Sequence, residues 1–373
     1  MPESKVKEGK VRLLLPAETD PADMATRRMP VFYNPIMKEN RDVSVAMLRS
    51  AFSGGDAVRI GLPLAGSGIR ALRFSLELPQ EMVAGIWAND MSDTAVAVMK
   101  EQVELNRAKK IIVSQQEANC FIRGSKGFDY IDIDPFGSPN PFLDTAVQRL
   151  SRRGMLAVTA TDTAPLSGTY MKACRRKYDA TPLRCAMMHE IGLRILIRKV
   201  QLVGMQYDRA LLPVLSYSKD HYFRVYLQNV KGKKDCDAVW MQHGVLSYCQ
   251  RCQWHAGRVP HVSSCPHCGA DVEQVGPMWL GRLYYDALID SLDADCALLE
   301  SIKEEMSIPV LGFFDIPMIH KRLHTSRNVP FDELMEAISH KGYGVARTHF
   351  LATALKTDMP LEELEKIIEK KQG

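Results

Sequence analysis

The chain has 373 residues, of which 46% are hydrophobic and 25% are charged, and its formal net charge is +4 at pH 7. This length and composition are typical of a soluble globular protein with two or three domains. No apolar run is long enough for a transmembrane helix, the N-terminal segment has no signal-peptide hydrophobic region, and the nine cysteines do not suggest a secreted disulfide scaffold. We therefore expect a cytoplasmic protein that does not bind membranes, with a monomer as the working assumption.

Apolar runs typical of strands alternate with helical patterns from Ala57 onward. Helices are predicted over 69–78 and 92–106, and strands over 57–64, 82–88, 111–115, 128–133 and 154–161. This alternation indicates parallel βαβ units in one doubly wound sheet. A long helical pattern over 183–203 precedes two β-rich runs, 210–218 and 222–230, and the three residues between these runs suit a hairpin. Five parallel strands closed by an antiparallel hairpin form the α/β sheet of the class I (Rossmann-like) methyltransferase fold.

A polar segment, KGKKDCD at 231–237, marks a predicted domain junction. We expect one domain over 1–230 and a C-terminal α+β domain over 231–373, with a zinc module at about 240–276. The module contains two C-x2-C pairs separated by twelve residues, formed by Cys249, Cys252, Cys265 and Cys268. Four thiolates fit tetrahedral Zn²⁺ and leave no open coordination position, so the predicted zinc is structural.

Three motifs at predicted strand ends favour a nucleoside ligand. Gly66 and Gly68 form a glycine loop before a helix, where backbone can approach a ligand closely, although such a pair also fits an ordinary turn. Asp90 can accept hydrogen bonds from both ribose hydroxyls, or it can cap the next helix. Glu117, followed by Ala118, can meet an adenine amino group. These motifs do not separate S-adenosylmethionine from NAD.

The stretch YIDIDPFGSPN, residues 130–140, favours methyl transfer to an amine. An exocyclic amine of a base attacks poorly, and a carboxylate that accepts its N–H localises the lone pair and can take the proton. We assign this role to Asp134, with Asp132 as a second candidate of lower weight. Pro135 would hold the carboxylate rigidly, and Phe136 would stack on the face of the base.

Two further segments carry predictions with open alternatives. In VFYNPIMKENRD, residues 31–42, Phe32 and Tyr33 can form a second aromatic wall and Arg41 can bind a carboxylate or phosphate, but composition alone favours a helix lead-in with core aromatics. Residues 170–234 contain 14 Lys or Arg against 4 Asp or Glu. This balance favours a face that binds a polyanion, or a solvated helix face.

The chain resembles the tRNA (guanine-26, N2) dimethyltransferases of the archaeal type nearly from end to end. The resemblance lies in blocks that occur in the same order: FYNPIMKENRD, GSGIRALRF, DPFGSP, ATDTAPLSGTYMKACRRKYDATPLR, HEIGLRILI, GMQYDRALLPVLSYSKDHYFRVYL and THFLATALKTD. It implies a class I methyltransferase domain that uses S-adenosylmethionine and a C-terminal tRNA-binding domain.

The resemblance also implies roles for individual residues. Asp134 would be catalytic, Phe32 and Phe136 would enclose the guanine, and the cofactor would be lined by Arg41, Arg70, Asp90, Glu117 and Ala118. The expected reaction transfers one or two methyl groups to N2 of guanine 26 in tRNA. Two alternatives stay open: an amino-methyltransferase acting on another RNA or DNA base, and a non-catalytic zinc-ribbon protein that binds RNA.

Overall fold

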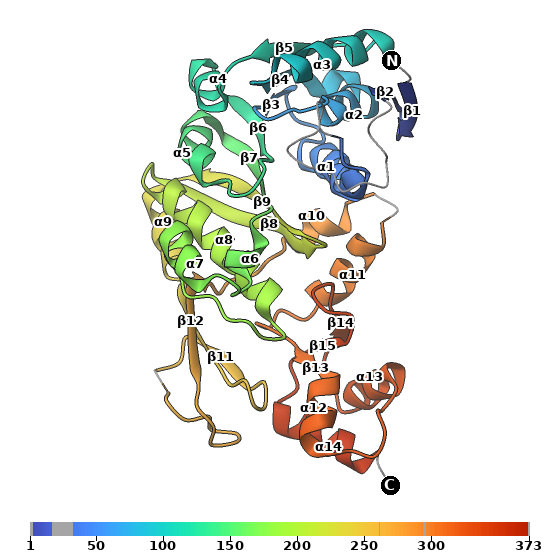
Figure 1. Ribbon diagram of the computed structural model, residues 1–373. Helices are drawn as coiled ribbons and strands as arrows, with labels where there is room; N and C mark the ends of the chain where they lie inside the picture. The colour runs from blue at the N-terminus through green and yellow to red at the C-terminus, as the bar shows by residue number, and fades with distance from the viewer. Residues whose placement is uncertain (1–2, 17–32, 261, 294–295, 372–373) are drawn as a thin grey trace.

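The computed structural model describes residues 3–16, 33–260, 262–293 and 296–371. Its centre is a seven-stranded sheet in the order β5-β4-β3-β6-β7-β9-β8 (Figure 1). The first five strands are parallel, and β9 is antiparallel to both β7 and β8. The strands are β3 (Val58–Leu62), β4 (Val83–Asp90), β5 (Ile111–Gln115), β6 (Phe128–Ile133), β7 (Leu150–Ala160), β8 (Arg209–Lys219) and β9 (Tyr222–Lys231). The predicted class I sheet is therefore confirmed.

Helices cover both faces of this sheet, as expected when parallel strands are joined by crossovers (Figure 1). One face carries α1 (Lys38–Ala51), α2 (Ile69–Glu77) and α3 (Asp93–Leu105). The other carries α4 (Ala118–Gly124), α5 (Asn140–Arg149) and α8 (Met188–Met205). Four further short helices are η2 (Gln80–Met82), α6 (Thr163–Leu166), α7 (Met171–Tyr178) and, at the start of the C-terminal part, α9 (Lys233–Trp240).

Helix α8 begins five residues later than the helical pattern predicts. Just upstream, Thr181 exchanges two backbone hydrogen bonds with Gly276, at 2.7 and 2.8 Å. This pairing holds the chain in an extended conformation before the helix. Residues 182–187 then form an irregular segment and a turn before the helix begins.

An N-terminal hairpin that the sequence pattern did not predict packs beside α2 and α3. It consists of β1 (Glu3–Glu8) and β2 (Val11–Pro16), and the helix η1 (Pro35–Met37) leads from this region into α1. Val11 and Leu13 are buried with Leu72 of α2 in a small core of their own. The hairpin brings Glu8 into the interior of the protein, where it is 1% exposed.

Beyond α9, the C-terminal part contains two small sheets and five further helices among the described residues (Figure 1). The first sheet joins β10 (His243–Tyr248), β11 (His255–Gly257) and β12 (Glu273–Trp279), and the second joins β13 (Phe314–Asp315), β14 (Val345–Arg347) and β15 (Ala354–Thr357). The helices are α10 (Asp286–Asp290), α11 (Ala297–Met306), α12 (Ile316–Leu323), α13 (Phe331–His340) and α14 (Leu361–Lys370). No helix in the described part of the chain has the length and apolar character that crossing a membrane requires.

The main hydrophobic core continues from the large sheet into β10, β12 and α11. A second core surrounds three of the four paired cysteines and the C-terminal helices. Arg194 of α8 strengthens the junction, because it donates hydrogen bonds to the carbonyls of Trp279 and Gly281 at 3.1 and 2.8 Å. The boundary between 230 and 231 stays a prediction, since apolar packing runs across it.

Candidate active site

A cavity of about 620 Å³ lies at the carboxyl ends of the parallel strands. This volume is typical of sites for ligands of nucleoside size, and the position is where open α/β sheets bind ligands. Seven of the predicted residues line it: Arg41, Gly66, Asp90, Ala118, Asp134, Pro135 and Phe136. Met37, Met91 and Phe142 contribute further apolar wall. The structure thus brings the predicted motifs from four strand ends into one cavity.

Asp90 fixes the glycine loop from the neighbouring strand. Its Oδ2 accepts a hydrogen bond from the backbone N–H of Gly66 at 2.9 Å, and its Oδ1 accepts one from Ser92 at 3.0 Å. Ser92, and not Asp90, caps helix α3. Gly68 has a φ of 76°, and a Cβ there would lie 2.6 Å from Met99, so glycine is required where the loop enters α2.

Glu117 lies apart from the lining of the cavity. It is exposed and caps α4, with its side chain accepting from the backbone of Cys120 at 2.9 Å. Hydrogen bonds to Asn119 and Cys120 lower its pKa from the ordinary value. Its neighbour Ala118 is buried in the cavity wall.

Asp134 is held in place by Arg70. The Arg70 guanidinium donates to Asp134 Oδ2 at 2.6 Å and to the side chains of Ser44 and Asn40 at 2.7 and 2.9 Å. Among the described residues, the second oxygen of Asp134 makes no hydrogen bond. Arg70 was predicted to line the cofactor, and it lines a smaller hollow next to the main cavity. In this structure it is also the residue that orients the predicted catalytic carboxylate.

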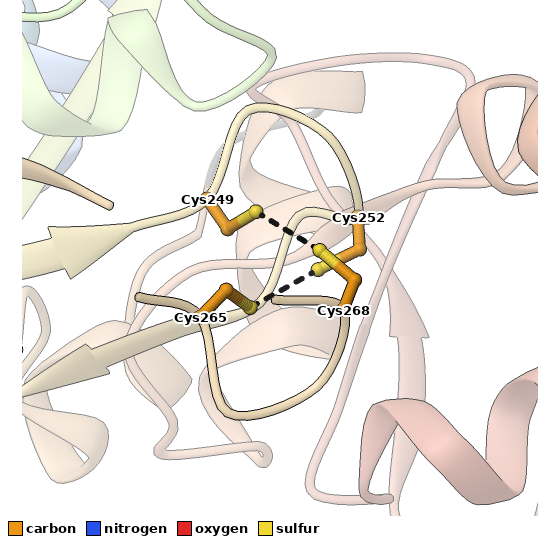
Figure 2. Close-up of side chains that lie close together, drawn as sticks. All are labelled: Cys249, Cys252, Cys265 and Cys268. Carbon is orange, nitrogen blue, oxygen red and sulfur yellow. Dashed lines mark hydrogen bonds between the residues drawn. The ribbon is translucent and has the colours of Figure 1, made fainter. Parts of the chain in front are cut away.

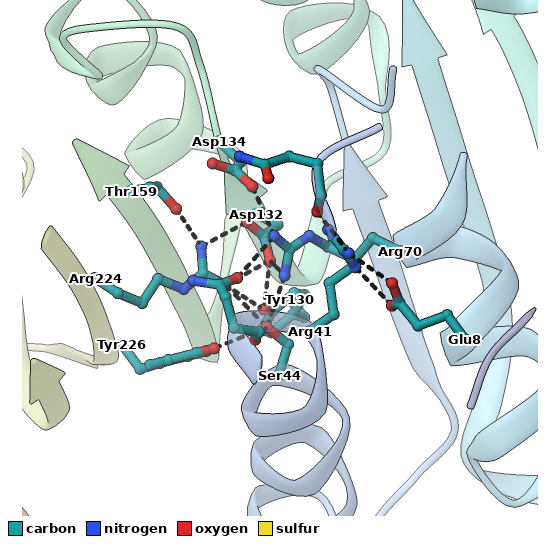
Figure 3. A network of polar contacts seen from close by, with 12 residues as sticks. Glu8, Arg41, Ser44, Arg70, Tyr130, Asp132, Asp134, Thr159, Arg224 and Tyr226 are labelled. Carbon is teal, nitrogen blue, oxygen red and sulfur yellow. Dashed lines mark hydrogen bonds and ion pairs between the residues drawn. The ribbon is translucent and has the colours of Figure 1, made fainter. Parts of the chain in front are cut away.

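Asp132 lies deeper and is fully engaged in a buried network (Figure 3). The guanidinium of Arg224 contacts both of its oxygens, at 2.8 and 2.7 Å, and Tyr130 donates to it at 2.7 Å. Burial raises the pKa of Asp132, but the charges of Arg224 and Arg70 outweigh burial and bring the pKa to about 2. The side chain of Asp132 is 2% exposed, against 24% for Asp134. Asp134 is therefore the carboxylate that reaches the cavity.

Arg41, the other predicted cofactor arginine, is paired with the N-terminal hairpin (Figure 3). It makes two hydrogen bonds to Glu8, at 2.7 and 2.6 Å, and Glu8 also accepts from Arg73 at 3.0 Å and from Tyr33 at 3.0 Å. Burial raises the pKa of Glu8, but Arg41 and Arg73 outweigh burial, so the net pKa is lowered. Tyr33 is buried and bonded to Glu8, and it lines the smaller hollow that also contains Arg70 and Asp134, so its place in an aromatic wall stays a prediction. Phe32 lies outside the described residues.

The segment after Asp134 is anchored to the end of β7. The backbone N–H of Gly137 donates to Thr161 Oγ1 at 2.6 Å, and the N–H of Thr161 donates back to the Gly137 carbonyl at 3.0 Å. Gly137 has a φ of 88°, which favours glycine at this turn. The turn presents Phe136 at the cavity, 41% exposed.

The basic segment divides into a surface part and a buried part. Eight residues are exposed: Lys172, Arg175, Arg176, Lys177, Arg184, Lys231, Lys233 and Lys234. Arg194 and Arg224 are buried and paired with Glu190 and Asp132. The surface is therefore less basic than the count of residues predicts, because buried arginines serve the fold.

The four paired cysteines converge into one cluster (Figure 2). Their sulfur atoms all lie within 4.8 Å of one another, with 3.5 Å between Cys249 and Cys268 and 3.6 Å between Cys252 and Cys265. Zn–S bonds of about 2.3 Å in a tetrahedron place sulfurs about 3.8 Å apart. None of the four forms a disulfide. The predicted four-cysteine cluster is confirmed, and its geometry fits zinc.

The sheet order and a cavity built from a glycine loop, an acid at the end of β4 and Asp-Pro-Phe at the end of β6 define a class I methyltransferase. A family model described as N2,N2-dimethylguanosine tRNA methyltransferase matches residues 9–369. The chain belongs to this family. The family predicted from the sequence and the prediction of a methyltransferase are both confirmed.

Individual relatives match over almost their whole length. The chain is 36% identical to the tRNA (guanine(26)-N(2)/guanine(27)-N(2))-dimethyltransferase of Aquifex aeolicus, covering 98% of this chain and 95% of that protein. It is also 36% identical to the tRNA (guanine(26)-N(2))-dimethyltransferase of Methanothermobacter thermautotrophicus, with 97% and 98% covered. The solved structure of Trm1 from Pyrococcus horikoshii with S-adenosyl-L-methionine superposes with a TM-score of 0.83 at 32% identity, covering 98% of this chain and 99% of that one.

Proposed function

We propose that this chain transfers methyl groups from S-adenosylmethionine to the exocyclic N2 of guanine 26 in tRNA, once or twice per base. The observation that carries the proposal is the position of Asp134, Pro135 and Phe136 in the same cavity as Gly66 and Asp90. One cavity then contains Asp134, which can accept from an amine, Phe136, which can stack on a base, and Asp90, which can bind a ribose. The names of the Aquifex and Methanothermobacter relatives support the choice of base.

In this proposal, one end of the cavity holds the cofactor. Gly66 offers backbone at the loop, Asp90 accepts from the ribose hydroxyls, and Ala118 packs beside the adenine. Glu117 reaches the adenine amino group only if its bonds within the cap of α4 rearrange. Arg41 lines the cavity at the side of the Glu8 pair and would meet the cofactor carboxylate. The cofactor supplies an electrophilic methyl group on a sulfonium.

Asp134 would then act on the guanine amine. Its Oδ2 is bound by Arg70, so Oδ1 remains to accept the N2–H of the base. This contact orients the amine and localises its lone pair, and the carboxylate can take the proton as the methyl group arrives. Phe136 stacks on the purine, and Pro135 restricts the backbone between them.

The proposed partner is tRNA. Guanine 26 joins two stems, so it must leave its stack to enter the cavity. The exposed basic residues of α7 and of 231–234 would bind phosphates, and their affinity would fall with rising salt. The C-terminal part, from 231, would extend the tRNA-binding surface, with zinc on the four cysteines stabilising it. A cytoplasmic location belongs to the same proposal.

The test compares wild type with Asp134→Ala on an unmodified tRNA transcript. Nucleosides are analysed by mass after incubation with labelled S-adenosylmethionine. We expect N2-methylated guanine with the wild type and a rate roughly 100 to 10,000 times lower with Asp134→Ala, while calorimetry shows cofactor binding in both. Asp129→Ala is the matched control, because Asp129 belongs to the same strand but pairs with Arg59 away from the cavity. Near-normal turnover by Asp134→Ala would remove Asp134 from the mechanism.

The same assay separates the alternatives. Transcripts with guanine only at 26 or only at 27 show whether the enzyme methylates one of these positions or both. The name of the Aquifex relative, which includes both positions, raises this question. DNA and ribosomal RNA test an amino-methyltransferase of other specificity. A zinc-ribbon protein without catalysis would bind tRNA but not S-adenosylmethionine.

A further inference from the structure

Helix α7 has a basic outer face and an inner face that packs against the loop carrying the predicted catalytic residues. Lys172, Arg175 and Arg176 are exposed on the outside. Cys174 and Tyr178 are fully buried on the inside. The helix is only eight residues long. A short rigid element therefore separates a surface suited to phosphate from residues 134–140.

The hydroxyl of Tyr178 links two parts of that loop region. It lies 2.7 Å from Asp162 Oδ1 and 3.0 Å from Ser138 Oγ. Burial, followed by the charge of Asp162, raises the pKa of Tyr178 well above its ordinary value, so the hydroxyl stays a neutral donor. Asp162 follows Thr161, which is bonded to Gly137.

Two further contacts join α7 to the same region. Asn140 Nδ2 donates to the backbone carbonyl of Lys177 at 2.8 Å, and Lys177 Nζ lies 3.0 Å from Asp162 Oδ2. Lys177 is 45% exposed, whereas Asp162 is 10% exposed. The largely covered Asp162 carboxylate thus contacts both the buried hydroxyl of Tyr178 and the lysine at the surface. None of these contacts involves the cofactor end of the cavity.

We propose that α7 couples tRNA binding to the catalytic loop, with Tyr178 and Asp162 as positioning residues. Phosphates bound by Lys172, Arg175 and Arg176 fix the helix, and the Tyr178 hydroxyl transmits its position to Ser138. Phe136 and Asp134 lie two and four residues from Ser138, so their placement depends on this link. This inference rests on the proposed function for its substrate and adds the route by which substrate binding organises the site.

The test uses Tyr178→Phe, which keeps the ring and removes both hydroxyl contacts. With saturating tRNA and S-adenosylmethionine, the single-turnover rate of methyl transfer should fall roughly tenfold or more, because small displacements of reacting groups are costly. The dissociation constants of tRNA and cofactor should stay within about twofold. Tyr343→Phe is the matched control, since that hydroxyl also contacts a carboxylate, Glu363 at 3.1 Å, but in the C-terminal part.

An unchanged rate in Tyr178→Phe would overturn the proposal. So would a lost rate accompanied by an equal loss of tRNA affinity, or an equal loss of rate in Tyr343→Phe. Asp162→Asn is a second variant, which keeps an oxygen for Tyr178 but loses the ion pair with Lys177. Its rate should fall in the same direction by a smaller factor, and a full wild-type rate would contradict the role of Asp162.

Hydrogen exchange gives a readout that does not need catalysis. Binding of tRNA should slow exchange of residues 134–140 in the wild type and in Tyr343→Phe, and this effect should disappear in Tyr178→Phe. Equal protection in all three proteins would overturn the coupling. If the wild type binds tRNA without methylating it, the proposed function fails, while this measurement still decides the inference.

Discussion

The buried pair of Asp132 and Arg224 offers the sharpest test of how the site is held together. Arg224 is completely buried, and its guanidinium contacts both oxygens of Asp132 at 2.8 and 2.7 Å. Replacing Asp132 by asparagine keeps the size of the side chain but leaves Arg224 as an uncompensated buried charge. Breaking a pair of this kind costs about 3 to 5 kcal/mol. For the part of the chain that contains the large sheet, this corresponds to a melting temperature roughly 6 to 20 °C lower.

The stability difference between wild type and Asp132→Asn should depend on pH, and this dependence tests whether the Asp132–Arg224 ion pair is its cause. The pKa of Asp132 falls from 3.8 to about 2 on folding. Because the folded-state pKa is depressed, the stabilisation is fully present above pH 3.8 and is lost as the pH falls toward 2. At about 1.4 kcal/mol per pKa unit, the loss is about 2 to 3 kcal/mol. The asparagine side chain of the variant does not titrate, so the gap between wild type and Asp132→Asn should narrow below pH 4.

Urea unfolding of both proteins between pH 7 and pH 2.5 measures this gap. Other buried acids, such as Glu8, titrate in both proteins and largely cancel in the difference. Adding Arg224→Met to Asp132→Asn should recover part of the stability, because the unpaired charge is then gone. A gap that stays constant down to pH 2.5, or a double variant less stable than Asp132→Asn by the full cost of a second lesion, would refute the reasoning.

Two further changes test the zinc module and the N-terminal hairpin. Cys249→Ser should lower both the zinc content measured by metal analysis and the melting temperature of the C-terminal part. Cys120→Ser is the control and should change neither, because Cys120 is exposed and lies outside the cluster. Equal zinc content in both variants would contradict a site formed by the four paired cysteines. Glu8→Gln should weaken S-adenosylmethionine binding in calorimetry about tenfold, because Arg41 loses a charged partner, and an unchanged affinity would show that Glu8 does not position Arg41.

The strands and the cavity motifs could be predicted because their signals are local. Apolar runs alternate with helical patterns, Asp90 is the last residue of its strand, and Asp134 directly follows its strand. The cysteine spacing predicted the cluster for the same reason. The start of α8 was predicted too early, because the helical pattern of the sequence continues through residues 183–187, which form an irregular segment and a turn. The N-terminal hairpin also has a local signal in the sequence, because Gly9 stands between two alternating segments.

The sequence pattern could not predict which carboxylates pair with Arg41, Arg70 and Arg224. Arg224 interrupts the apolar run of β9, which indicates a buried charge with a partner, but Asp132 is 92 residues away in the chain. Arg70 and Arg41 were assigned to a ligand by resemblance, and the structure shows each bound to a carboxylate of the protein itself. A sequence motif predicts which residue types lie near a ligand. Which carboxylates its arginines pair with depends on the whole fold.

Helix α8 contacts the C-terminal part of the chain, and a buried ion pair between Glu190 and Arg194 lies in its first two turns. Glu190 accepts from the backbone of Gly312 at 3.1 Å, and Arg194, which pairs with Glu190, donates to the carbonyls of Trp279 and Gly281 at the end of β12. We expect an enzyme braced in this way to close little around a large nucleic acid. If the RNA then has to bend and open to bring its guanine into reach, stiff, over-stabilised junctions in the substrate should be methylated slowly.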